Sequence, residues 1–195
     1  EPVNLELKEA NLTQPIIPKN WQDISLATLS YGYGMSVSLL HMAKAYAILA
    51  NGGFDIEPTI LKKKEVGHVG SRVLKQTTSD EILKLLEAVV MDQRGTAKIL
   101  RSKYYRIGGK TGTAEKISIV KKGYQKDKVV ANFVGLFPLQ EPRFVIAAFL
   151  DEPENNLLQE PCRYASCTVV PMVKKLIERT GPLMNVTPDN QALMF

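Results

Sequence analysis

The clearest helical pattern in the chain lies over residues 78–90. Apolar side chains recur there at i, i+3, i+4, i+7 and i+8, which places them on one face of an amphipathic helix. They are Ile82, Leu85, Leu86, Val89 and Val90. Thr78-Ser79-Asp80-Glu81 has the spacing of a capping box, so we expect the helix to begin at this tetrapeptide.

Two further segments carry apolar residues at helical spacing, 36–50 and 168–179. The first ends at Asn51-Gly52-Gly53, where glycine accepts the left-handed conformation that stops helices. His41 breaks its apolar face, and we interpret this residue as a polar group at the edge of that face. We therefore predict a helix over each segment.

Strand patterns follow over 109–117, 129–137 and 144–150, and two shorter extended runs lie at 59–61 and 72–74. Residues 144–150 are almost wholly apolar, as expected of a strand covered on both faces. The connections between the three long strands are short, which favours an antiparallel meander. We predict an α+β fold, in which a sheet of three late antiparallel strands packs with helices. An irregular tail is expected over 182–195.

Composition narrows the function classes. The 195 residues include 25 Lys+Arg and 20 Asp+Glu, and 45% are hydrophobic, as in ordinary globular proteins. The sequence contains no run of about eighteen uncharged apolar residues, which is the length that a bilayer-spanning helix needs. The positive charges are scattered and accompany no nucleic-acid-reading motif, so they indicate a solvated surface and no nucleic-acid partner.

The two cysteines, Cys162 and Cys167, match no common zinc-ligand spacing, and both histidines lie far away in the sequence. We therefore predict no metal site. Two buried or surface thiols are the default expectation, and the sequence leaves open whether they are free. A disulfide between them would need an oxidising compartment and a non-helical segment, because positions i and i+5 on a helix point apart.

The candidate chemistry lies in Gly108-Gly109-Lys110-Thr111-Gly112-Thr113-Ala114-Glu115. On a strand, Lys110 and Gly112 face one way and the two threonines face the other. At a sheet edge, such a strand can pair with an extended peptide, and a backbone N–H can form half of an oxyanion hole. The alternative is a glycine-rich hairpin strand without a function. The spacing of a phosphate-binding loop is missing.

In its context, this segment resembles the penicillin-binding proteins, serine enzymes with S-x-x-K, S-x-N and K-T-G elements. More narrowly, the chain looks like the C-terminal half of a class B transpeptidase domain, of the kind that cross-links septal peptidoglycan in cell division. The similar segments, in the family's order, are Ser30–Gly34, His41–Ala47, Ala50–Gly53, Gly95–Ala97, Tyr105–Lys116, Asn132–Gly135, Pro142–Phe144 and Asp151–Pro153. The resemblance covers residues 21 to 188.

The S-x-x-K and S-x-N elements are missing from their places in this order. Ser118-Ile119-Val120-Lys121 spells S-x-x-K, but it follows K-T-G beside a strand connection, whereas the family's element needs a helix. Ser79-Asp80-Glu81 has Glu where S-x-N has Asn. The resemblance thus implies that residues 1–195 form the C-terminal half of the domain. Without the nucleophile, this chain alone is expected to be inactive.

The resemblance also implies roles for the K-T-G strand. Lys110 would complete a proton and charge network with serine and lysine partners outside this chain. The hydroxyls of Thr111 and Thr113, on either side of Gly112, would bind the carboxylate of the substrate or of a β-lactam. The backbone N–H of Thr113 would contribute to the oxyanion hole.

Tyr124 and Tyr164 would form walls of the substrate cleft, unless they are ordinary half-exposed tyrosines. The parent protein is expected to be a peptidoglycan D,D-transpeptidase, a transferase that forms an acyl-serine from a stem peptide ending in D-Ala-D-Ala. It would bind β-lactams and use no metal or organic cofactor. Its expected location is the periplasmic face of the bacterial inner membrane, anchored by a segment outside this chain.

The expected partners besides substrate are the N-terminal half of the domain and proteins of the division machinery. Two other functions stay open from the residues alone. The first is a non-catalytic peptide- or protein-binding module that uses the K-T-G edge strand. The second is a basic nucleic-acid-binding domain. A carboxypeptidase activity and a role in elongation are also left open.

Overall fold

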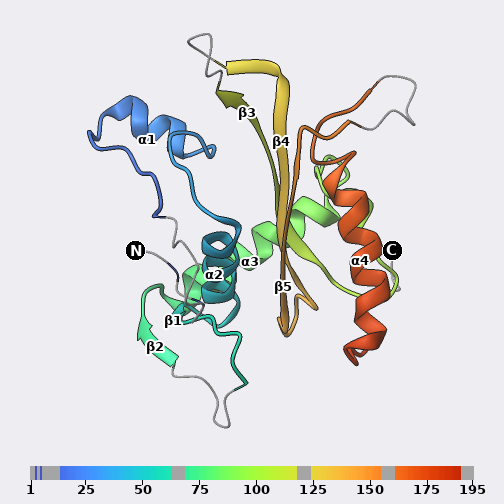
Figure 1. The fold of residues 1–195 in the computed structure, drawn as a ribbon. Coiled ribbons are helices and arrows are strands. Elements are labelled where there is room, and N and C mark those ends of the chain that lie inside the picture. The colour runs from blue at the N-terminus through green and yellow to red at the C-terminus, as the bar shows by residue number, and fades with distance from the viewer. Residues whose placement is uncertain are drawn as a thin grey trace.

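The computed structural model describes residues 3, 5, 14–62, 69–117, 124–154 and 161–189, with the backbone alone at 69, 117 and 124–127. Three antiparallel strands form the central sheet in the order β3-β4-β5: β3 (Gly108–Ile117), β4 (Tyr124–Phe137) and β5 (Phe144–Asp151). Helices flank this sheet on both sides (Figure 1). The predicted α+β fold and the meander are confirmed.

The two faces of the sheet carry separate apolar clusters. On one face, Phe133 of β4 is fully buried together with Val173 of α4 (Val169–Leu183). On the other face, Leu136 packs in a cluster that includes Tyr46 of α2 (Leu39–Ala50). Neighbouring positions along β4 alternate between these faces. The K-T-G strand is therefore hydrogen-bonded to a strand that is buried on both sides.

The helices agree with the predicted segments except at their ends. The Ser38 hydroxyl caps α2, accepting the His41 N–H at 3.3 Å, so this helix begins at Leu39. The α4 helix continues to Leu183 and includes Gly181, which packs against the ring of Tyr105. Residues 184–189 have no helix or strand. A short helix that was not predicted, α1 (Asp23–Leu29), precedes α2.

The capping-box prediction for α3 (Gln76–Met91) is wrong, because the helix begins before the predicted box. The N–H groups of Val73 and Leu74 both donate to Gly53 O, which fixes the chain just ahead of the helix. Ser79 consequently lies inside the helix and is fully buried. Its hydroxyl has no hydrogen-bond partner among the residues that the structure describes.

A second, two-stranded sheet consists of β1 (Phe54–Ile56) and β2 (Val69–Arg72). The predicted run at 59–61 is therefore wrong, and the run at 72–74 overlaps β2 at one residue. The Asn51 side chain exchanges two hydrogen bonds with the backbone of Phe54, so the chain passes directly from α2 into β1.

The expected covering of β5 on both faces is also not observed, since Phe149 is 54% exposed. Among the helices in the described ranges, none combines the length and apolar character needed to cross a membrane. A short 3-10 turn, η1 (Lys98–Leu100), connects α3 to the segment that leads into β3.

Candidate active site

The K-T-G segment lies in the first half of β3, at an edge of the central sheet. In the described part of the chain, β4 is the only strand that pairs with β3. The register pairs Lys110 with Val134 and Thr111 with Phe133. The alternation expected from the sequence thus holds: Lys110 faces away from the two threonine side chains.

The Lys110 side chain is exposed, and its ammonium donates a hydrogen bond to the carbonyl of Thr111 at 2.8 Å. It makes no ion pair with any carboxylate in the described ranges. A positive charge is therefore held at the strand edge and is free to interact with an anionic ligand or a neighbouring nucleophile.

Thr111 is supported by a residue from a distant part of the sequence. Its hydroxyl lies 2.7 Å from the hydroxyl of Thr96 in the turn after α3. This turn sits tightly on the end of α3: the Ala97 N–H donates to Val89 O at 3.2 Å, and a Cβ at Gly95 would collide with the same oxygen. In the sequence, Gly95–Ala97 was noted only as a segment similar to the family. The contact between Thr96 and Thr111 was therefore not predicted.

Gly112 lies against the side chain of its partner on β4. The register places Asn132 directly opposite, and a Cβ built on Gly112 would lie 2.6 Å from Asn132 Oδ1. A side chain at position 112 would therefore force the Asn132 amide, the flexible end of its side chain, to move aside. The absence of a side chain at Gly112 therefore leaves room for the Asn132 amide over the K-T-G strand.

The Thr113 hydroxyl accepts a hydrogen bond from the backbone N–H of Ala165 at 3.1 Å. Ala165 is 2% exposed and lies in the loop between β5 and α4. A disulfide joins Cys162 and Cys167 across this loop, with a Cα–Cα distance of 6.3 Å. The default expectation of two thiols is wrong, because residues 162–167 form a turn and the two Cα atoms come within disulfide range.

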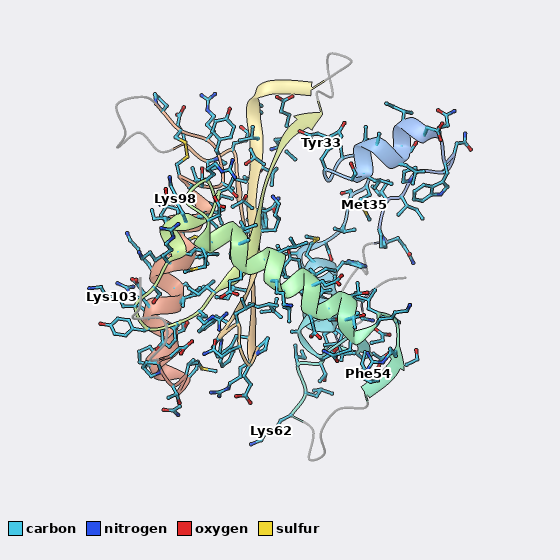
Figure 2. All side chains as sticks on the ribbon, turned by 180° about the vertical axis from the view of Figure 1, so that it is seen from behind. Tyr33, Met35, Phe54, Lys62, Lys98 and Lys103 are labelled. Carbon is cyan, nitrogen blue, oxygen red and sulfur yellow. A yellow bond between two sulfur atoms is a disulfide. The ribbon has the colours of Figure 1, made fainter. Side chains whose placement is uncertain are left out.

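A cavity of about 310 Å³ adjoins Thr113. Its lining comes from β3, β4, the loop before α4 and the segment before α2: Tyr33, Thr113, Glu115, Val129, Pro161, Arg163 and Tyr164. The Tyr33 hydroxyl accepts a hydrogen bond from the Glu115 N–H at 3.4 Å, and Figure 2 shows Tyr33 beside the far end of β3. Of the two predicted cleft tyrosines, Tyr164 lines this cavity, and Tyr124 is described only as a backbone paired with Ile117.

A larger cavity, of about 620 Å³, lies between α3 and residues 101–107. Its charged lining includes Arg106, whose guanidinium pairs with Glu87, and Arg101, which donates to Met91 O at 2.7 Å. It contains none of the predicted site residues. The smaller cavity is therefore the better candidate for a substrate cleft, because Thr113 and Tyr164 line it, although Lys110 and Thr111 do not.

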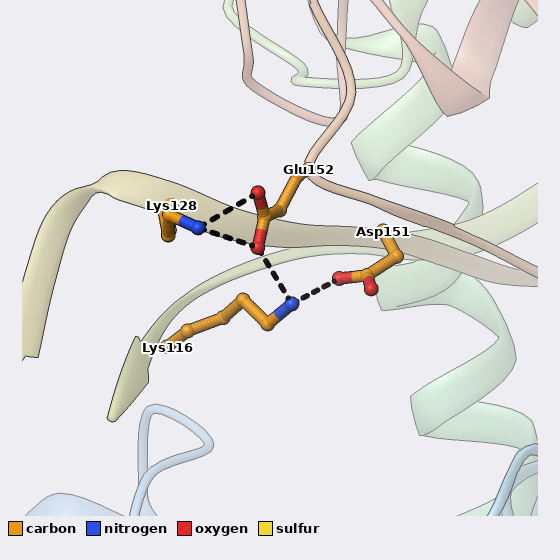
Figure 3. A network of polar contacts seen from close by, with 4 residues as sticks. All are labelled: Lys116, Lys128, Asp151 and Glu152. Carbon is orange, nitrogen blue, oxygen red and sulfur yellow. Dashed lines mark hydrogen bonds and ion pairs between the residues drawn. The ribbon is translucent and has the colours of Figure 1, made fainter. Parts of the chain in front are cut away.

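Beyond K-T-G, four charged side chains connect the ends of the three strands (Figure 3). The Lys116 ammonium of β3 lies 2.8 Å from carboxylate oxygens of both Asp151 and Glu152, and Lys128 of β4 lies 3.3 Å from Glu152. The hydrogen bonds to Asp151 and Glu152 raise the pKa of Lys116, and the hydrogen bond from Lys116 lowers the pKa of Glu152. This network links the far end of β3 to the end of β5 across β4. No group of three or more potential metal ligands occurs among the described side chains.

Comparison with known proteins identifies the family of this fold. Residues 2–177 match the penicillin binding protein transpeptidase domain. The chain is 32% identical over 193 residues to a probable peptidoglycan D,D-transpeptidase FtsI of Caulobacter vibrioides, covering 95% of this chain and 32% of the relative. It is also 32% identical over 170 residues to a probable PenA of Neisseria flavescens, covering 87% of this chain and 40% of the relative.

A solved structure agrees with this match. The apo transpeptidase domain of Burkholderia pseudomallei penicillin-binding protein 3 has 36% identity and a TM-score of 0.81, over 95% of this chain and 54% of that one. This chain therefore spans about half of that solved domain, and less than half of the length of these two curated relatives. It belongs to the family of penicillin-binding protein transpeptidase domains.

Proposed function

We propose that the complete protein containing this chain is a peptidoglycan D,D-transpeptidase, and that this chain supplies its K-T-G strand. The observation that carries the proposal is the geometry of β3. One edge strand presents a lysine and two threonine hydroxyls, Thr111 and Thr113, each held by a contact from elsewhere in the fold. The names of the relatives support the same activity.

In the proposed reaction, a serine from another segment of the protein attacks the carbonyl carbon of the penultimate D-Ala of a stem peptide. The terminal D-Ala leaves with a proton, and an acyl-serine remains until an acceptor amine attacks it. Thr111 and Thr113 bind the terminal carboxylate through their hydroxyls. The Thr113 N–H stabilises the developing oxyanion, and the Lys110 charge supports proton transfer near the serine.

β-Lactams are proposed to bind at the same place, because the anionic group beside their strained amide, a carboxylate in penicillins and a sulfonate in aztreonam, matches these hydrogen-bond donors. The structure of penicillin binding protein 3 from Mycobacterium tuberculosis with aztreonam supports this assignment, at 26% identity and a TM-score of 0.74. Tyr164, at the cavity beside Thr113, is assigned to the wall that contacts the ligand side chain.

Labelling with a fluorescent penicillin tests the proposal. The complete protein is expected to form a stable adduct on a serine within S-x-x-K, and Lys110→Ala is expected to lower the acylation rate constant by 100-fold or more. The isolated 195-residue chain is expected to remain unlabelled. Stable labelling of the isolated chain would overturn the proposed division of roles and would direct attention to Ser118.

The proposed location is the periplasmic face of the inner membrane. The Cys162–Cys167 disulfide supports an oxidising compartment, since structural disulfides are rare in the bacterial cytosol. The proposed partners are the remainder of the transpeptidase domain and proteins of the division machinery. Family membership favours the enzyme over a non-catalytic peptide-binding module, which would bind stem peptide but would never be acylated.

A further inference from the structure

We propose that the Cys162–Cys167 disulfide positions the Thr113 hydroxyl for carboxylate recognition. In this arrangement, the disulfide keeps the Ala165 N–H against Thr113 Oγ1, so that the hydroxyl hydrogen is directed to the ligand. The inference rests on the proposed role of Thr113 and extends it to residues more than forty positions away along the chain. Cys162 and Cys167 are positioning residues, because they act through Thr113.

The first step is the chemistry of the hydroxyl. A threonine hydroxyl has one hydrogen to donate and two lone pairs to accept with. The Ala165 N–H occupies one lone pair of Thr113 at 3.1 Å. The hydroxyl hydrogen must then lie away from Ala165, and an ionised carboxylate, which only accepts hydrogen bonds, is a matching partner.

The second step is how the loop holds Ala165. On the helix side, the Val170 N–H donates to Ala165 O at 3.0 Å, and the Thr168 hydroxyl donates to Tyr164 O at 2.8 Å. These bonds tie the second half of the loop to the start of α4. The disulfide connects the first half to the same anchor, because it joins Cys162 to Cys167.

The third step compares strengths. A single N–H to hydroxyl bond makes only a small net contribution to stability, because water in an adjoining cavity competes with it. The Arg163–Glu154 ion pair of the same loop is partly exposed and holds the loop weakly. A covalent link across six residues limits the conformations that the loop can adopt. The disulfide therefore increases the fraction of time in which Ala165 donates to Thr113.

The test measures acylation of the complete protein by two ligands, a penicillin with a free carboxylate and its methyl ester. The double variant Cys162→Ser/Cys167→Ser is expected to lose about 3- to 10-fold in the rate constant for the acid. The ester is expected to change by less than about twofold, because it lacks the carboxylate. Ser166→Ala, an exposed change inside the same loop, serves as the control and should affect neither ligand.

A double-mutant cycle gives the decisive outcome. In a Thr113→Val background, removal of the disulfide should cause no further loss with the acid, since the hydroxyl is already absent. Equal losses with acid and ester would show a merely structural role and overturn the inference. The same conclusion would follow if the acid rate were unchanged, or if the loss persisted in full without the Thr113 hydroxyl.

A second measurement separates this inference from the proposed function. Hydrogen exchange at the Ala165 amide is followed in the 195-residue chain, before and after reduction of the disulfide. Reduction is expected to speed exchange by about 3-fold or more, and Thr113→Val in the oxidised chain should act in the same direction. If the complete protein is not acylated at all, the proposed function fails. Unchanged exchange at the Ala165 amide after reduction would overturn the positioning role of the disulfide, whatever the acylation result.

Discussion

The hydroxyls of Thr96 and Thr111 lie 2.7 Å apart, which joins the turn after α3 to the K-T-G strand. With the Ala165–Thr113 bond, this contact means that both threonine side chains of the site are held by segments outside the sheet. The strand supplies the spacing of the two hydroxyls, and the α3 turn and the disulfide loop supply their orientation.

Loss of the Thr96 hydroxyl should weaken carboxylate recognition. Thr96→Val removes the partner of Thr111 but keeps the shape of the side chain, and it is expected to lower penicillin acylation of the complete protein by about 5-fold. Thr96→Ser keeps the hydroxyl and should retain most of the rate. Equal rates for the valine and serine variants would contradict a role for this hydroxyl pair.

The Gly112–Asn132 pair predicts a rescue between two strands. Gly112→Ala places a Cβ against the Asn132 amide and is expected to lower the free energy of unfolding of this chain by about 1 kcal/mol, because the amide at the end of the side chain can rotate aside. Asn132→Ala removes the colliding atoms, so the double variant should recover most of that loss. Urea unfolding of the four proteins measures the coupling. Simple additivity of the two changes would refute the steric explanation.

The same substitution at two serines, Ser79 inside α3 and Ser38 at the N-cap of α2, should change stability in opposite directions. Ser79→Ala removes a buried hydroxyl that has no partner among the described residues, and it should raise the free energy of unfolding by about 1 kcal/mol. Ser38→Ala removes the N-cap of α2 and should lower it by about 1 kcal/mol. Thermal and urea unfolding of both variants provide the measurement. Destabilisation by Ser79→Ala would imply a partner for its hydroxyl.

The charge network at the strand ends predicts an acid dependence of stability. The pKa of Glu152 is lowered from 4.5 in the fold, chiefly by the hydrogen bond from Lys116. The contribution of the Glu152 carboxylate to the free energy of unfolding is therefore present above about pH 4.5. It is lost as the pH falls through the lower pKa that this group has in the folded state. Wild type should exceed Glu152→Gln in stability at pH 6, and the difference should vanish toward pH 3 and shrink in high salt. A pH-independent difference would exclude this origin.

At the alkaline end, burial raises the pKa of Tyr46 to about 12. Because the pKa of Tyr46 is higher in the folded state, the stability that its neutral phenol contributes is fully present below the ordinary pKa of 10. This contribution declines as the pH rises toward 12. Tyr46→Phe cannot ionise and should lose less stability than wild type between pH 9 and pH 12. Urea unfolding across this range compares the two proteins. Parallel pH profiles would show that the Tyr46 phenol is solvated.

The parts of the fold that the sequence predicted are those governed by a local period. The apolar face of α3 follows from helix geometry except at Leu85, which was predicted on that face but is 66% exposed. The alternation of Lys110 with the two threonines follows from strand geometry. Family resemblance assigned the candidate site to β3, and that assignment stays a prediction. Even so, the helix start near Ser79 was misplaced, because a capping-box pattern also fits inside a helix whose start is set by the segment packed on Gly53.

The contacts that complete the site could not be predicted from spacing. Thr96 lies 15 residues from Thr111, and Ala165 lies 52 residues from Thr113. Such pairs depend on the packing of whole elements, which no local pattern encodes. The Cys162–Cys167 bond was missed for a related reason: whether positions i and i+5 approach each other depends on the turn between them.

The register of the sheet also provides a place from which the site can be observed. Gly112 pairs with Asn132, and Asn132 pairs with Phe149, so three residues form one row across the sheet. Phe149 is 54% exposed and stands about 10 Å from Gly112, two strand spacings away. A fluorescent or spin label at position 149 would thus report ligand occupancy at the opposite edge without occupying the cleft.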